Sequence, residues 1–239
     1  MKEFNQETSP SIDGEENLYG YIESVYSGSG VDGKGLRVVV FFSGCNLRCP
    51  FCHNPETLFK QGEKYSIDKI VAKIKRYKTY LKRGGVTLSG GEPFLQSEFA
   101  VSLVEELKKI GLSTCIETNG HIINEKLISL SEYIICDVKN QETDDLSIYH
   151  EFLAVCDKLN KRVELTNVLV PTKNDDDKKI KKLNELILNH VCCSGIRFLP
   201  FRKMCVEKYK SLGLEYPYKN IEEADENLIL HAKTLIISK

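Results

Sequence analysis

The stretch LRVVVFFSGCNLRCPFCHNP, residues 36–55, joins an apolar run of β-branched and aromatic residues to three closely spaced cysteines. The run 36–42 is typical of a strand that is buried on both faces. Cys45, Cys49 and Cys52 follow it with C-x3-C-x2-C spacing, so three of the nine cysteines fall within eight residues. A buried strand that ends in a loop of soft ligands predicts a metal site built on an α/β sheet.

Composition predicts one large α/β domain. The chain has 239 residues and 41% hydrophobic content, which is enough for a sizeable core. Lys and Arg total 33 against 34 for Asp and Glu, so we expect no nucleic-acid partner. We expect no membrane partner either, because no stretch approaches the roughly 18 apolar residues of a membrane span. Residues 1–16 predict a polar tail ahead of a domain over 17–239.

The odd cysteine count and the irregular spacings do not resemble a secreted disulfide scaffold. They indicate reduced thiols and therefore a cytoplasmic protein. Six cysteines outside the motif are interpreted as small buried hydrophobes or inert surface thiols. They are Cys115, Cys136, Cys156, Cys192, Cys193 and Cys205.

Apolar runs alternate with amphipathic stretches along the rest of the chain. Strands are predicted at 36–42, 85–89, 113–117, 133–138, 162–170 and 195–199. Helices are predicted at 66–81, 99–110, 124–131, 145–160, 176–190 and 221–233. Ser66 is placed to cap the first helix, Gly111 to end the second, and NDDDKK (174–179) to form a loop and an acidic first turn. Six strand–helix units predict a parallel sheet, either doubly wound or an incomplete (β/α) barrel.

Unusual residues follow four consecutive strands of this pattern. The cysteine loop follows the first, SGGEP (89–93) the second and ETNG (117–120) the third, while Asp137 and Lys139 close the fourth. Because the carboxyl ends of parallel strands share one edge of the sheet, we expect these groups on one rim.

Three thiolates from one loop suit either an iron–sulfur cluster or zinc. A structural zinc site needs four ligands, and His53 points away when its neighbour Cys52 points in. Three ligands on a four-iron cluster would leave one iron open. Gly90 and Gly91 would let a small ligand approach the backbone, with Glu92 accepting bonds from an ammonium group, although a glycine pair alone is ordinary turn chemistry.

Together these motifs resemble a known family. The cysteine triplet with Phe51 before its last member, followed by GGE, resembles the radical S-adenosylmethionine (SAM) enzymes. SGSGVDGKGLR (27–37), CNLRCPFCHNP, GGVTLSGGEP, CIETNG, DVK and VLVP occur in the order seen in the glycyl-radical enzyme activases of the pyruvate formate-lyase activating group. The resemblance runs from about Tyr19 to the end of the chain.

The resemblance implies an incomplete (β/α)6 barrel with a [4Fe–4S] cluster on the three cysteines. The fourth iron would be chelated by SAM, and reductive cleavage would give methionine and a 5′-deoxyadenosyl radical. That radical would abstract hydrogen from a glycine of a partner, pyruvate formate-lyase or a relative. A flavodoxin or ferredoxin-type protein would supply the electron.

The resemblance also implies roles for individual residues. Gly90, Gly91 and Glu92 would contact the methionine amino group of SAM. Phe51 and His53 would lie near its adenosine, and Asp137, Val138 and Lys139 would line the rest of the SAM site. Glu117 and Thr118 would lie near SAM and a monovalent cation, with Glu117 in place of the family's Asp. Asp32 would meet the partner's glycine loop.

Two positions depart from the family pattern. Thr166 stands where the family has an arginine, and Arg202 where it has a histidine, and both family residues help to hold SAM. Altered SAM contacts are expected, and the partner's identity stays open. A radical SAM enzyme for a small molecule, such as the deazapurine-forming type, and a zinc-binding interaction module are the alternatives, although VDGKGLR favours the activase.

Overall fold

The computed structural model describes residues 18–237, so the predicted tail over 1–16 lies outside the described residues. The strands are β1 (Tyr19–Ser29), β2 (Arg37–Phe42), β3 (Glu63–Ser66), β4 (Gly85–Gly90), β5 (Thr114–Thr118), β6 (Tyr133–Asp137), β7 (Arg162–Leu169) and β8 (Cys193–Pro200). The helices are α1 (Ile67–Lys75), α2 (Ser97–Lys109), α3 (Glu125–Leu130), α4 (Ser147–Lys158), α5 (Asp177–Lys182), α6 (Asn184–Asn189), α7 (Val206–Ser211) and α8 (Glu226–Thr234).

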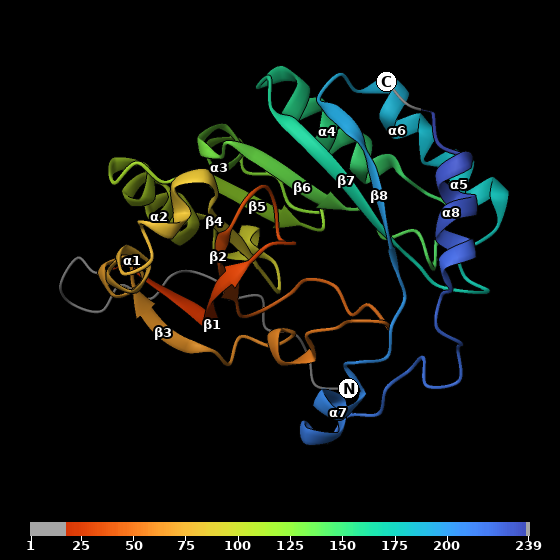
Figure 1. Cartoon of the computed structure of the whole chain (residues 1–239), viewed down its shortest axis with the longest axis horizontal. Coiled ribbons are helices and arrows are strands. Elements are labelled where there is room, and N and C mark those ends of the chain that lie inside the picture. Colours follow the sequence, from red (N-terminus) through yellow and green to blue (C-terminus); the bar gives the residue numbers. More distant parts are fainter. Residues whose placement is uncertain (1–17, 238–239) are drawn as a thin grey trace.

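One sheet contains all these strands, in the order β3-β1-β2-β4-β5-β6-β7-β8. From β2 to β8 the strands are parallel and succeed one another in chain order (Figure 1). A sheet that is always extended at the same edge has no topological switch point, which excludes the doubly wound alternative. Since β3 and β8 do not pair, the sheet is open, and the predicted incomplete barrel is confirmed.

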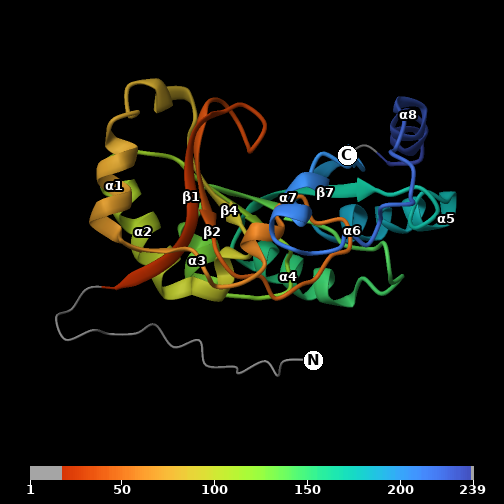
Figure 2. The same cartoon turned by 90° about the horizontal axis from the view of Figure 1, so that it is seen from below.

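The sheet is curved, with α1 to α4 on its convex side (Figure 2). Side chains alternate between the two faces of each strand. On β2, Val38, Val40 and Phe42 join the main core with residues of the helices. On the opposite, concave face the strands carry polar groups towards their carboxyl ends, including Asp137 and its register neighbour Thr166. The packing therefore leaves the concave face free for a site.

All six predicted strands are present, but β1 and β3 were missed. Both are antiparallel and form one edge of the sheet. β1 is a half-exposed edge strand with polar residues and glycines, and β3 has only four residues, so neither shows a buried apolar run. As predicted, the cysteine loop lies between β2 and the first helix, α1, and the unpredicted β3 directly precedes that helix.

Helix ends follow local capping chemistry. Ser66 caps α1 by accepting a hydrogen bond from Lys69 N, and Gly111 has φ +74° after α2, as predicted. The first helix ends at Lys75, before residue 81, and the predicted helix over 176–190 divides at Leu183 into α5 and α6. The last predicted helix begins at Glu226, not at residue 221, and α7 was not predicted.

Candidate functional site

A cavity of about 590 Å³ lies on the concave face at the carboxyl ends of the strands. Twelve of the sequence-predicted site residues line it: Asp32, Cys45, Cys49, Phe51, Cys52, His53, Gly90, Gly91, Glu117, Thr118, Asp137 and Lys139. The structure thus brings four strand ends and the β1–β2 hairpin loop together. Glu92 and Val138 are the predicted residues that do not line the cavity.

The two ends of the cysteine loop are joined to each other, and its first end is joined to the residue after β4. Gly44 N donates to Thr57 O at 2.8 Å, and Gly44 O accepts from Glu92 N at 2.8 Å. All three cysteines of the motif are free and partly buried. Burial raises the pKa of each thiol above its usual value, to about 11 for Cys52. A metal must therefore displace these protons, as thiolate ligation requires.

The glycine pair has a structural task that is more specific than the turn chemistry considered in the sequence analysis. Gly90 has φ +104°, and a Cβ atom there would lie 2.4 Å from Phe42 N. A Cβ atom on Gly91 would lie 2.0 Å from Gly44 O. Both glycines line the cavity, but it is protein backbone that first requires them, because the end of β4 packs directly against the cysteine loop.

Glu92 is fully buried and does not line the cavity. Its carboxylate accepts hydrogen bonds from Phe94 N at 3.1 Å, Thr118 Oγ1 at 2.9 Å and Asn119 N at 2.8 Å. Burial raises the pKa of Glu92 to about 7, although these three hydrogen bonds act to lower it. The side chain joins the loops after β4 and β5, and its contact with an ammonium group stays a prediction. Val138 likewise packs into the main core.

Asp137 and Lys139 form an ion pair at the end of β6. The other oxygen of Asp137, Oδ1, is buried and has no hydrogen-bond partner. Lys139 Nζ lies 5.2 Å from the centre of the Phe51 ring, a cation–π distance. Burial alone would lower the pKa of Lys139, but the Asp137 carboxylate and the neighbouring Cys49 raise it. The cavity wall therefore offers an unused buried acceptor beside a permanent cation and an aromatic face.

The cavity is acidic around Glu117. Its Oε2 accepts a hydrogen bond from Ser89 Oγ at 2.6 Å. Burial raises the pKa of Glu117 to about 7, and the carboxylates of Asp32 and Asp137 add to the shift. Carboxylates that repel each other in a buried position favour a bound cation. The cation role of Glu117 and Thr118 stays a prediction.

Asp32 reaches the cavity because loop 30–36 folds back over the concave face. Its carbonyl oxygen accepts from Thr87 Oγ1 at 2.6 Å, and Thr87 Oγ1 accepts from Arg37 Nε at 2.6 Å. Arg37 is only 1% exposed and also donates to Val86 O at 2.7 Å. Arg37 and Thr87 therefore hold the hairpin that carries Asp32, a role that sequence analysis missed.

The position of Thr166 has a cationic neighbour. Thr166 lines the cavity and is the register partner of Asp137 on one side and of Arg197 on the other. Arg197 also lines the cavity, and its Nε donates to Glu164 at 2.9 Å. Arg197 of β8 thus places a guanidinium beside Thr166 and Asp137. The alternation of side chains along GIRFL (195–199) indicates that Arg197 points to the concave face, but sequence analysis did not use it.

The segment after β8 covers the cysteine loop. Phe51 stacks on Tyr218 with 6.3 Å between ring centres. From α7, Lys208 Nζ donates to Asn54 Oδ1 at 2.9 Å and to Glu56 Oε1 at 2.6 Å. His53 Nε2 bonds Arg202 O at 2.8 Å. These contacts link residues about 150 positions apart, and no local motif indicates them.

Comparisons with known proteins point to the same chemistry. Residues 31–185 match the model of a family described as a 4Fe-4S single cluster domain. The pyruvate formate-lyase-activating enzyme of Clostridium pasteurianum is 34% identical over 222 residues, which cover 87% of this chain and 93% of that protein. The chain belongs to the pyruvate formate-lyase-activating enzyme family. The Staphylococcus epidermidis member is 34% identical over 236 residues, 90% of this chain and 94% of that protein.

Solved structures give the fold of this activating-enzyme family member. A radical SAM methyltransferase from Sphaerobacter thermophilus matches with TM-score 0.58 and 17% identity, over 96% of this chain and 74% of that one. QueE from Escherichia coli matches with TM-score 0.56 and 16% identity, over 82% and 92% of the two chains. At these identities the likeness shows the radical SAM fold alone.

As a member of the pyruvate formate-lyase-activating enzyme family, the chain is a radical SAM enzyme whose cofactors are an iron–sulfur cluster and SAM. The residues present fit both groups. Three soft thiols face one cavity, its volume of about 590 Å³ suits a ligand of SAM's size, and Asp137 Oδ1 offers a buried acceptor without a partner. None of the helices within residues 18–237 combines the length and the apolar composition of a membrane crossing.

Proposed function

We propose that this enzyme is an activase that takes a hydrogen atom from a glycine of a partner glycyl-radical enzyme, pyruvate formate-lyase or a relative. The observation that carries the proposal is the match to activating enzymes over about nine tenths of the chain. The cavity supports it, because the cysteine loop and the Asp32 hairpin line the same space.

Cys45, Cys49 and Cys52 would hold the [4Fe–4S] cluster. When bound and reduced, the cluster would supply the electron for reductive cleavage of SAM. This chain's residues bind and orient. Asp137 Oδ1 would accept a hydrogen bond from SAM, while Lys139 pairs with the other oxygen of the same carboxylate.

Other residues around the cavity complete the proposed site. Phe51 and His53 lie beside the adenosine, and Gly90 and Gly91 present backbone to the methionine end. Glu117 and Thr118 hold a monovalent cation. These assignments are supported by the shared cavity and by the acidic environment of Glu117.

Asp32 would bond backbone amides of the partner's glycine loop. Its main chain is fixed by the bond from Thr87 Oγ1 and its carboxylate accepts from Ser29 Oγ. We further propose a cytoplasmic location, a radical SAM domain over 17–239, and a flavodoxin or ferredoxin-type electron donor. Reduced thiols and an oxygen-sensitive cluster both favour a reducing compartment.

The test is anaerobic incubation of the reconstituted enzyme with SAM, a one-electron reductant and candidate glycyl-radical enzymes, followed by electron paramagnetic resonance. A glycyl doublet with matching 5′-deoxyadenosine is expected. 5′-Deoxyadenosine formed with a small molecule, and no protein radical with any candidate, would contradict the proposal and favour the small-molecule alternative.

A further inference from the structure

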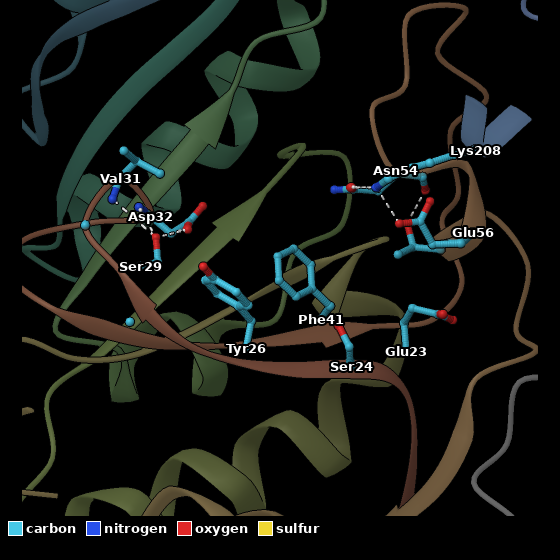
Figure 3. Close-up of a pocket in the computed structure, with 13 residues that line it drawn as sticks. Glu23, Ser24, Tyr26, Ser29, Val31, Asp32, Phe41, Asn54, Glu56 and Lys208 are labelled. Carbon is cyan, nitrogen blue, oxygen red and sulfur yellow. Dashed lines mark hydrogen bonds and ion pairs between the residues drawn. The ribbon is translucent and has the colours of Figure 1, made fainter. Parts of the chain in front are cut away.

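A second cavity, of about 470 Å³, adjoins the first and lies along β1 (Figure 3). We call it the β1 cavity. Its lining residues are Glu23, Ser24, Tyr26, Gly28, Ser29, Gly30, Val31, Asp32, Phe41, Asn54, Glu56, Thr57 and Lys208. Val31, Asp32, Asn54 and Thr57 line both cavities. The two cavities therefore adjoin at these four residues.

The charge in the β1 cavity is predominantly negative. Glu23, Asp32 and Glu56 contribute three carboxylates, and Lys208 is the one cation in the lining. Lys208 Nζ is already engaged by Glu56 Oε1 at 2.6 Å and by Asn54 Oδ1 at 2.9 Å. The second oxygen of Glu56 is buried with no hydrogen-bond partner. With Glu56 paired to Lys208, Glu23 and Asp32 leave an excess of negative charge that favours a cationic group.

Two aromatic rings in the β1 cavity indicate which kind of cation would fit there. Tyr26 is 58% exposed, and Figure 3 shows its ring beside Phe41, between Asp32 and Glu56. Lysine and arginine pack their aliphatic stems on apolar surface and place their charged ends over aromatic faces. Two rings flanked by carboxylates are therefore suited to a long basic side chain.

The strand beneath the cavity also favours a peptide over a free small molecule. β3 pairs with β1 only from Tyr19 to Ile22. Over the rest of β1, Glu23–Ser29, no strand of residues 18–237 pairs with this outer edge. Unpaired strand edges bind extended chains through backbone hydrogen bonds. A peptide that extends out of the β1 cavity would lie directly against the unpaired edge of β1.

We propose that the β1 cavity binds an arginine or lysine side chain of the partner segment that flanks the radical-site glycine. The inference rests on the proposed function, because it takes the partner to be a protein whose glycine enters the adjoining cavity. It makes Glu23 and Tyr26 residues that determine which partner is accepted.

The test uses reconstituted full-length enzyme with SAM and without reductant. The probes are fluorescent capped nonapeptides of alanine and serine around one central glycine, with a single arginine at each other position in turn. Counterparts carry glutamine or glutamate in its place. At least one arginine peptide is expected to bind about three- to tenfold more tightly than its glutamine counterpart, the sum of a partly exposed ion pair and a cation–π contact.

Three variants report on the residues involved. Glu23→Lys is expected to remove the preference for arginine and to favour the glutamate counterpart. Tyr26→Ala is expected to reduce the preference by about two- to fivefold. Glu151→Lys makes the same charge change on the exposed face of α4, and this matched control should keep the wild-type preference.

Equal dissociation constants for the three peptide series, no measurable binding, or a preference that survives Glu23→Lys would overturn the β1 cavity proposal. Its failure is separable from that of the proposed function. A glycyl doublet on a partner protein without charge discrimination would contradict only the β1 cavity proposal. Charge discrimination with no glycyl doublet on any partner would contradict the activase assignment and leave a cavity that prefers basic peptides of another origin.

Discussion

Asn174→Ala tests a buried amide network behind the rim of the cofactor cavity. Asn174 is fully buried in the loop after β7. Its Nδ2 donates to Asn140 Oδ1 at 2.9 Å, to Asn167 Oδ1 at 3.1 Å and to Val168 O at 3.0 Å. Its Oδ1 accepts from Val170 N at 2.8 Å. The side chain thus joins the loops that leave β6 and β7.

The expected cost follows from what the truncation leaves unpaired. Asn140 Oδ1 keeps the donor Asn167 Nδ2, and Val168 O keeps Gln141 Nε2. Val170 N–H and Asn167 Oδ1 lose the partners that they have in the structure. With one buried unpaired donor, one unpaired acceptor and two weakened contacts, the free energy of unfolding should fall by about 3 kcal/mol. Against total stabilities of about 5–15 kcal/mol, that is a large loss.

Urea unfolding of the apoprotein measures this change. Asn227→Ala, at an exposed position of α8, is the control and should lie within about 0.5 kcal/mol of wild type. Asn174→Asp keeps the acceptor for Val170 N but sets a carboxylate oxygen against three oxygens, so it should destabilise at least as much as alanine. A loss below about 1 kcal/mol for Asn174→Ala, or a stable Asn174→Asp, would refute the hydrogen-bond reasoning.

The other predictions concern the site itself. Alanine at Cys45, Cys49 or Cys52 should abolish iron binding and SAM cleavage while the fold is kept, as iron analysis and circular dichroism would show. The control Cys192→Ala should bind as much iron as wild type, and a loss of iron in this variant would indicate a second cluster. Asp137→Asn should weaken SAM binding about tenfold in calorimetry, because the amide loses either the Lys139 pair or the free acceptor, and unchanged affinity would remove Asp137 from the site. Burial raises the pKa of Glu117 to about 7 from its ordinary 4.5, so between these values the folded state holds a proton that the unfolded state releases. The free energy of unfolding of the apoprotein should therefore fall as pH rises through that window, and the fall should be smaller in Glu117→Gln. Urea unfolding at pH 5 and pH 7.5 measures both proteins, and an equal fall in wild type and variant would contradict the shift.

The sequence by itself determined the six parallel strands and predicted which cysteines hold the cluster. Buried parallel strands need continuous apolar runs such as 36–42, and cluster ligation needs closely spaced thiols such as Cys49 and Cys52, so both signals are local. Helix caps at Ser66 and Gly111 are local for the same reason, since each satisfies backbone groups within one turn. The family resemblance used these same local motifs.

Only the tertiary structure decided which polar groups are buried and what they meet. Glu92 was expected at a ligand, but the loops after β4 and β5 enclose it and supply its three donors. Asn174 lies in a polar run and is nevertheless fully buried, while Arg197 reaches the cavity from a strand remote in sequence from Asp137. Burial and hydrogen-bond partners depend on segments that fold together from distant parts of the chain, and no spacing along the sequence encodes that distance.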